Sequence, residues 1–268
     1  MGIDLHIHTN FSDGTLSPEQ VVKKAVELNL SAIAITDHDT TEGISPAIEE
    51  AKLTNIEEIP GIELNTHYYE QEIHILGYYF DYQGAYINNI LKKLQQKRVD
   101  RAKKIVEKLN QLGIEISYER VRTIASGPSI GRPHIAEAMI EKHYVNSMKE
   151  AFDKFIGEDA PAYVHRAKLT PFEAINIIKQ ANGIPVLAHP GLLKDQSIIY
   201  DLIDNGIMGL EVYHSKHDEN QTEYYIKVAS ENGLLMTGGS DSHGEEPLLL
   251  GTISVPDKVL SELKKSRK

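Results

Sequence analysis

Hydrophobic and polar positions follow two alternating patterns over the first eighty residues. Short apolar runs at 3–8, 32–36 and 59–64 are rich in β-branched side chains, as in buried strands. Between the first two, 17–28 has apolar residues at helical spacing and opens with Ser-Pro-Glu-Gln, the signature of a capped helix start. Alternating strands and helices predict a parallel sheet with helices packed outside it.

The pattern changes in the middle of the chain. A hairpin is predicted over 68–80, turning near Glu70 and Gln71. A long lysine-rich segment of helical periodicity then runs from about 85 to 112 and ends at Gly113. Further helical patterns follow to about 156, and we find no run typical of a buried strand.

Strand and helix alternate again after Thr170 and Pro171, with strands predicted at 184–188, 209–213 and 234–238. We therefore interpret 83–170 as a helical insertion that covers the site. The segments 1–82 and 171–268 form one α/β domain, either a barrel or a doubly wound sheet. Both architectures place their sites at the carboxyl ends of the strands.

Composition narrows the classes of function. The chain has 268 residues, 41% hydrophobic and 25% charged, as in ordinary globular proteins. It has no apolar run of membrane-spanning length and no signal-peptide pattern, so we expect a cytoplasmic protein without a membrane partner. The absence of cysteine excludes disulfides and thiolate metal sites. A net charge of -11 argues against a grip on duplex DNA, but a small anionic substrate remains compatible with a metal-lined pocket.

Potential metal ligands stand at nearly every predicted strand end. His6 and His8 are two positions apart, so they point to the same side of their strand and can bind one divalent ion. The other strand ends and the hairpin carry Asp37, His38, Asp39, Glu63, His74, His189, Glu211, His214, Asp241 and His243. Because the fold brings strand ends together, we expect one metal cluster rather than independent core histidines.

At these residues the sequence resembles the PHP (polymerase and histidinol phosphatase) domain family. The resemblance runs through H-x-H, F-S-D-G, T-D-H-D, G-I-E, H-I-L-G, A-H-P and G-S-D-S-H in the family's order, over 1–82 and 170–245. It implies a distorted (β/α)7 TIM-like barrel with up to three metal ions. A G-R-P-H-I-A sequence at 131–136 resembles the stand-alone subgroup that acts on nucleotide phosphates and short RNA, in which a helical insertion covers the site.

The resemblance also implies roles for single residues. His6, His8, Glu63 and Asp241 would hold a first ion; Glu63, His74 and His189 a second; and Asp13, His38 and His243 a third. Asp37 would orient a ligand histidine. Nitrogen and oxygen ligands suit two to three ions of manganese, iron(II) or zinc, among which the sequence does not choose.

Other residues are candidates for substrate binding. Arg132 offers a planar guanidinium for phosphate. His134 either contacts the leaving group or caps its helix, and His214 either meets phosphate or protonates the leaving oxygen. His217 is a further candidate for substrate contact.

These features predict a metal-dependent phosphoesterase that hydrolyses a nucleoside monophosphate or bisphosphate, or the end of a short RNA, through a metal-activated hydroxide. Histidinol-phosphate phosphatase is an alternative that the G-R-P-H sequence disfavours. A polymerase-type 3′-exonuclease module is another, and the chain shows no polymerase domain. An amidohydrolase would also carry H-x-H, but the T-D-H and S-D-S-H sequences favour the phosphoesterase. The oligomeric state stays open.

Overall fold

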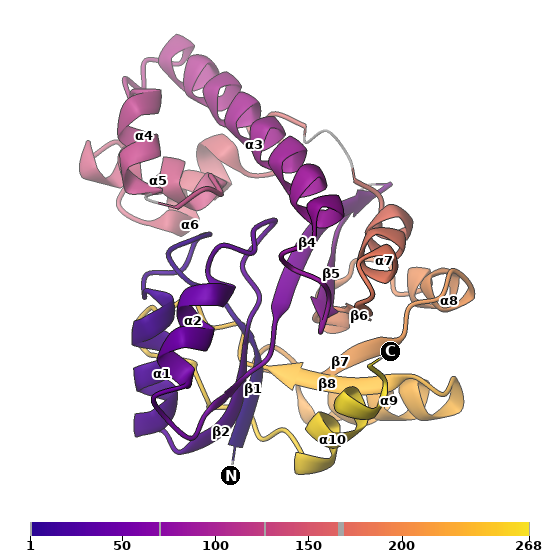
Figure 1. Cartoon of the computed structure of the whole chain (residues 1–268). Helices are drawn as coiled ribbons and strands as arrows, with labels where there is room; N and C mark the ends of the chain where they lie inside the picture. Colours follow the sequence, from indigo (N-terminus) through magenta and orange to yellow (C-terminus); the bar gives the residue numbers. More distant parts are fainter. Residues whose placement is uncertain (1, 70, 126, 166–168, 268) are drawn as a thin grey trace.

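The computed structural model describes residues 2–69, 71–125, 127–165 and 169–267. Its first part is a parallel sheet with two helices against it (Figure 1). In chain order these elements are β1 (Gly2–Ile7), α1 (Pro18–Glu27), β2 (Leu30–Ile35), α2 (Ile44–Ala51) and β3 (Glu57–Glu58). The predicted start of α1 is confirmed: Ser17 and Gln20 form a capping box, and Pro18 is the first helical residue.

The second sheet has the order β4-β5-β6-β7-β8. The strand β5 runs antiparallel to both of its neighbours, whereas β6, β7 and β8 are parallel. The elements are β4 (Gly61–Tyr68), β5 (Gln71–Tyr78), α7 (Pro171–Gln180), β6 (Ile184–Leu187), a 3-10 turn (Pro190–Leu192), α8 (Ile198–Asp204), β7 (Gly209–His214), α9 (Glu219–Glu231), β8 (Leu235–Gly239) and α10 (Asp257–Lys265).

The hairpin differs from its predicted position. The strand expected at 59–64 and the hairpin expected at 68–80 are one unit, in which β4 and β5 pair from Gly61 with Tyr78 to Tyr68 with Gln71. The polar residues of 65–67 hid the continuation of the first strand. Of the two predicted turn residues, Glu70 lies outside the described residues and Gln71 begins β5.

Hydrogen bonds join the two sheets on both sides. On one side, the amide of Asp241 donates to the carbonyl of His6 over 2.9 Å. On the other, the amide of Asp39 donates to the carbonyl of Glu63 over 3.0 Å. Gly239 permits the first approach, because a Cβ at this position would lie 2.3 Å from the backbone nitrogen of His6.

The fold is thus a mixed α/β structure built on parallel strands. Among the described residues the strands form two sheets rather than one closed barrel. Two features account for this difference from a regular (β/α)7 barrel. The β4–β5 hairpin adds an antiparallel strand, and β3 spans only two residues.

Helices fill the middle of the chain, and Figure 1 shows them above the loops that follow β1 and β2. They are α3 (Ala85–Gln111), α4 (Tyr118–Ile124), α5 (Arg132–Glu141), α6 (Met148–Ala151) and a π-helical turn (Phe152–Ile156). The first half of α3 buries Ile87 and Leu91 in the main core, whereas its second half buries Ile105 and Leu109 in a separate core with α4 and α5. The helix α3 therefore anchors the helical segment to the sheet. No helix in the described part of the chain is long and apolar enough to cross a membrane.

Candidate metal centre

The backbone turns sharply where the strands end. Asp39, His189 and Asp241 follow β2, β6 and β8, and their φ angles are +54°, +28° and +55°. Positive φ is uncommon outside glycine and persists where the surrounding structure imposes it, often at functional sites. These turns gather side chains from separate strands over one edge of the sheets.

Glu63 lies at the centre of this edge and is 1% exposed. Its Oε2 atom is 3.4 Å from His6 Nε2, 3.3 Å from His8 Nε2 and 2.9 Å from His38 Nδ1. Its Oε1 atom is 2.9 Å from His74 Nδ1 and 3.2 Å from His189 Nε2. Each oxygen therefore faces a different set of imidazoles, which is the arrangement expected of a carboxylate that bridges two ions.

Two further carboxylates complete the cluster. Asp241 Oδ1 is 3.1 Å from His8 Nε2 and 3.4 Å from His6 Nε2. Asp13 is 3.5 Å from His243 Nε2, 3.8 Å from His38 Nε2 and 3.9 Å from His8 Nδ1. Among the described residues there are four sets of potential ligand atoms in which the atoms of each set lie within 4.8 Å of one another. The sets are His6 with His8 and Asp241; His8 with Asp13, His38 and His243; His38 with Glu63 and His74; and His6 with Glu211 and His214. The structure brings the nine predicted ligands together, and their binding of metal stays a prediction.

The buried ring nitrogens show that the site fits divalent metal. His6 Nε2, His8 Nε2 and His38 Nδ1 have no hydrogen-bond partner among the described residues, although carboxylate oxygens lie close to each. Buried polar atoms are normally hydrogen-bonded. Donor atoms that surround a shared point without bonding one another suit a cation at that point, and nitrogen with oxygen donors suit manganese, iron or zinc.

Ionisation in the cluster is strongly coupled. Burial alone would raise the pKa of Glu63, but His74, His38 and His6 hold this pKa well below its usual range. Burial lowers the pKa of His8, but the nearby carboxylates of Asp241 and Glu63 outweigh burial and raise this pKa to about 10. The carboxylates thus stay ionised, and a metal ion that binds here displaces protons from imidazoles.

Glu211 is a site residue to which the sequence interpretation gave no role. It is fully buried at 0% exposure, and its Oε1 atom is 2.9 Å from His6 Nδ1. Its Oε2 atom accepts the amide of His189 over 2.7 Å. One carboxylate thus fixes two predicted ligand residues from different strands. The signal in the sequence was a glutamate at a predicted strand end, three residues before His214. The pairing of β7 with β8 changes register between Glu211 and Tyr213, and the alternation of side chains along a strand does not predict this change.

Among the described residues, the carboxylate of Asp37 bonds amide and hydroxyl groups rather than a histidine, which differs from its predicted role. Its carboxylate accepts the amide and the hydroxyl of Thr9 over 2.7 and 2.6 Å, and the hydroxyl of Ser12 over 2.5 Å. Asp37 therefore fixes the loop that leads to Asp13. These bonds join the loop that follows β1 to the loop that follows β2.

His214 and His217, the two C-terminal candidates for substrate contact, differ in which ring nitrogens remain available. His214 is buried; its Nδ1 accepts the amide of Lys216, and its Nε2 lies 3.7 Å from Asp241 without a hydrogen bond. In His217, Nδ1 bonds the carbonyl of Val212 and Nε2 accepts the amide of Gly191. Both nitrogens of His217 are thus engaged by backbone, which contradicts its predicted role as a substrate contact.

The G-R-P-H sequence lies at the start of α5. His134 is buried, and its Nδ1 accepts the amide of Gly131 over 3.0 Å, so it caps the helix. A cleft of about 310 Å³ runs beside it and is also lined by Asp13. Arg132 places Nη2 3.3 Å from both oxygens of Glu72 on β5. Arg132 therefore ties the helical segment to the hairpin, and a role in substrate binding stays a prediction.

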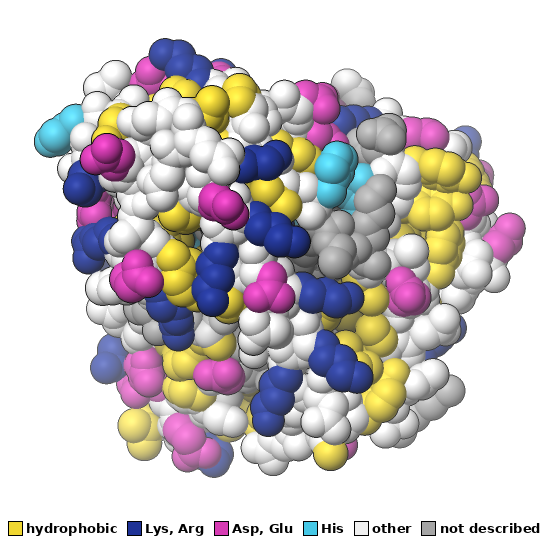
Figure 2. Space-filling model, turned by 90° about the horizontal axis from the view of Figure 1, so that it is seen from above, with side chains coloured by type: hydrophobic (Ala, Val, Ile, Leu, Met, Phe, Trp, Pro, Cys, Tyr) yellow, Lys and Arg dark blue, Asp and Glu magenta, His cyan; other side chains and the backbone are white. Residues whose placement is uncertain are grey.

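The face above the helical segment is mixed in charge. Figure 2 shows Lys and Arg side chains interspersed with Asp and Glu on this face. Lysines of α3 such as Lys92, Lys97 and Lys104 are exposed to solvent. As far as the described residues go, this face has no uniform basic surface of the kind that grips a duplex.

Comparison with known proteins agrees with this geometry. The PHP domain model matches residues 4–163, more than half of the chain, and the chain belongs to the PHP domain family. The 5′-3′ exoribonuclease Rnm of Escherichia coli K12 is 32% identical over 247 residues, which cover 90% of this chain and 84% of the relative. The 3′,5′-nucleoside bisphosphate phosphatase of Chromobacterium violaceum is 29% identical, with coverage of 90% and 87%.

A solved structure is also similar over the whole chain. A candidate metal-dependent phosphoesterase from Bifidobacterium adolescentis superposes with a TM-score of 0.92 at 30% identity, covering 100% of this chain and 97% of the other. The prediction of an enzyme that hydrolyses phosphate esters with divalent metal is thereby confirmed at the level of reaction class.

Proposed function

We propose that this chain removes nucleotides one at a time from the phosphorylated 5′ end of short RNA. The observation that carries the reaction class is the convergence of imidazoles on both oxygens of Glu63 at the edge where the strands end. The choice of RNA is supported by the relatedness to the exoribonuclease over 90% of the chain. The two sheets serve as an open, distorted barrel, and the helical segment 83–170 serves as its cover.

The metal ligands in this proposal are those that the family resemblance implied. His6, His8, Glu63 and Asp241 would hold one ion; Glu63, His74 and His189 would hold a second; and Asp13, His38 and His243 would hold a third. We expect manganese, iron(II) or zinc in two or three of these positions. Such ions supply a hydroxide near neutral pH and neutralise phosphate charge.

Protein side chains supply the remaining functions. Glu211 holds the ring of His6 and the backbone of His189 in place. The Nε2 atom of His214 lies beside Asp241 at the edge of the cluster, where it can give a proton to the leaving oxygen. Arg132 exchanges Glu72 for a substrate phosphate, which offers the same paired oxygens to the guanidinium.

A second candidate is the removal of one phosphate from a nucleoside 3′,5′-bisphosphate. The relative from Chromobacterium violaceum favours it. Both reactions use the same metal chemistry and differ in how much of the substrate extends beyond the reacting phosphate.

The test is a product analysis with manganese-loaded protein. Its substrates are a 5′-phosphorylated tetraribonucleotide, the same RNA with a 5′-hydroxyl, a nucleoside 3′,5′-bisphosphate and histidinol phosphate. We expect nucleoside 5′-monophosphates to appear in order from the phosphorylated end. Hydrolysis of the bisphosphate alone would establish the second candidate. Preference for histidinol phosphate, or turnover that survives Glu63→Gln, would refute the proposal.

A further inference from the structure

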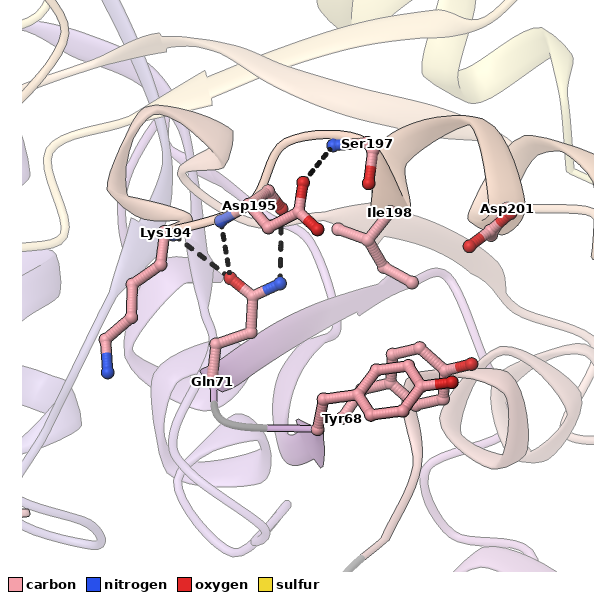
Figure 3. A pocket seen from close by; sticks show the side chains of 8 residues that line it. Tyr68, Gln71, Lys194, Asp195, Ser197, Ile198 and Asp201 are labelled. Atoms are coloured by element: carbon pink, nitrogen blue, oxygen red, sulfur yellow. Dashed lines mark hydrogen bonds between the residues drawn. The ribbon is translucent and has the colours of Figure 1, made fainter.

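A cavity on the outer side of the hairpin has no role in the chemistry described so far. It encloses about 300 Å³ between the tip of the β4–β5 hairpin and the segment that leads into α8. Figure 3 shows Tyr68 and Asp201 on one side, with Gln71 and Lys194 on the other. A volume of this size accommodates a small organic group such as one nucleoside.

One wall of the cavity is held rigidly. Gln71 donates to the carbonyl of Asp195 over 3.1 Å, and its oxygen accepts the amides of Lys194 and Asp195 over 3.0 and 3.2 Å (Figure 3). The carboxylate of Asp195 accepts the amide of Ser197 over 2.9 Å. The wall is therefore formed before any ligand arrives, which lowers the entropic cost of binding.

The opposite wall is aromatic. Tyr68 packs edge to face against Phe172, with ring centroids 5.1 Å apart at 90°. Tyr69 lies next to it, with centroids 4.4 Å apart at 66°. Tyr69 is 75% exposed and has a φ of +48°, an uncommon angle for an aromatic residue. An exposed aromatic ring beside a preformed cavity is a platform on which a nucleobase can stack.

The charges decide which part of a nucleotide fits. Asp195 and Asp201 line the cavity, so a phosphate inside it would be repelled. A base brings amino donors for Asp201 and a flat face for the tyrosines. Of the described residues that line the cavity, Lys194 is the basic one. Its Nζ lies 2.8 Å from Glu158 of the helical segment and can bind the phosphate that precedes this base.

The same two chain segments contribute to this cavity and to the metal centre. Gln71 stands three residues before His74 on β5, and Lys194 follows His189 by five residues. Three strand residues span about 10 Å. Gln71 and His74 point to opposite faces of β5, so an RNA strand would reach the cavity by passing beside 190–193.

We propose that this cavity binds the base of a nucleotide downstream of the one being released. The inference rests on the proposed action on RNA and names a recognition site for that substrate. If the cavity binds this base, affinity depends on substrate length, because a mononucleotide bound at the metal centre has no second base to place between the tyrosines and Asp201.

The kinetic test compares substrates of different length. Tyr69→Ala should raise KM for a 5′-phosphorylated tetraribonucleotide 5- to 50-fold, in the range for loss of one stacked base, and leave KM for a nucleoside 3′,5′-bisphosphate unchanged. Tyr69→Phe should restore the wild-type value, since stacking does not need the hydroxyl. Tyr200→Ala removes another exposed tyrosine, on α8 and 52% exposed, and is the matched control. Equal effects on both substrates, or none, would overturn the proposal.

A binding test separates this inference from the proposed function. The chain has no tryptophan, so Tyr69→Trp introduces a single tryptophan at the cavity, whose emission can be excited selectively over that of the tyrosines. A tetranucleotide with non-hydrolysable phosphorothioate linkages should quench it, and a mononucleotide should not. Quenching without RNA turnover by the wild type would retain the cavity and reject the exoribonuclease. Turnover without quenching, and with KM unchanged in Tyr69→Ala, would reject the cavity.

Discussion

Glu58 and Glu63 are two buried carboxylates five residues apart, in opposite electrostatic surroundings. Glu63 faces imidazoles from several strands, and its pKa is held well below the usual range. Glu58 is in β3, both of its oxygens are buried without hydrogen-bond partners among the described residues, and burial raises its pKa to about 8. A buried acid thus stays charged where positive charge or hydrogen-bond donors stabilise the carboxylate. Among the described residues, the groups of potential metal ligands lie at the edge with Glu63.

The largest expected effect comes from removing the charge of Glu63. Glu63→Gln should lower turnover at least a hundredfold and reduce the content of bound metal, because one carboxylate serves two predicted ion positions. Glu58→Gln is the matched control and should leave turnover unchanged. Elemental analysis and rates of phosphate release test this contrast. Normal metal content and activity in Glu63→Gln would mean that Glu63 does not bridge.

A buried ion pair near the metal centre should matter for stability. Arg98 of α3 donates Nε to Asp39 over 2.7 Å, and the side chain of Asp39 is 0% exposed. Arg98→Ala would remove the guanidinium that stabilises the charge of this carboxylate. We expect a loss of roughly 3 kcal/mol in the free energy of unfolding.

Urea unfolding tests the prediction for Arg98. The matched control is Arg120→Ala, which breaks the exposed pair with Glu141 and should cost clearly less than Arg98→Ala, because solvent screens an exposed pair. Asp39→Asn combined with Arg98→Ala should recover part of the loss. Equal costs for the two arginines would show that Asp39 is well solvated after all.

A smaller effect is expected from the carboxylate that positions two ligand residues. Glu211→Gln keeps an acceptor for His6 Nδ1 but removes the charge. Changes of this kind typically weaken metal binding by about 10- to 100-fold. Competition with a chelator measures this directly, with exposed Glu219→Gln as the control. Unchanged affinity would show that the backbone alone fixes His6 and His189.

The smallest expected effect is the pH dependence that Glu58 gives to the free energy of unfolding. Folded protein holds a proton on Glu58 up to a pKa of about 8, whereas the unfolded chain releases it near the ordinary 4.5. The free energy of unfolding therefore falls as pH rises from 4.5 to 8. Glu58→Gln should remove this slope and stabilise the protein by roughly 1–3 kcal/mol at pH 8. Urea unfolding at pH 5 and pH 8, at matched metal content, measures how the free energy of unfolding changes with pH. Glu57→Gln is the control. An equal change with pH in the wild type and in Glu58→Gln would contradict the prediction.

The sequence by itself determined most of the elements and the residue types that gather at the site. Ser17 and Thr170 each precede a proline and a polar residue at the third helical position, and both form capping boxes because these contacts are local. The histidine and carboxylate at each strand end were visible because parallel strands share one carboxyl edge. That edge holds the nine predicted ligands.

Only the tertiary structure decided which partner each polar side chain meets. Asp37 bonds Thr9 and Ser12 rather than a histidine, and His217 is engaged by backbone on both nitrogens. Glu211 acquires its role from His6, which is 205 residues away in the chain. A hydrogen bond forms or fails with changes of a few tenths of an ångström in the donor–acceptor distance. Between segments remote in sequence, residue spacing along one strand does not determine that distance.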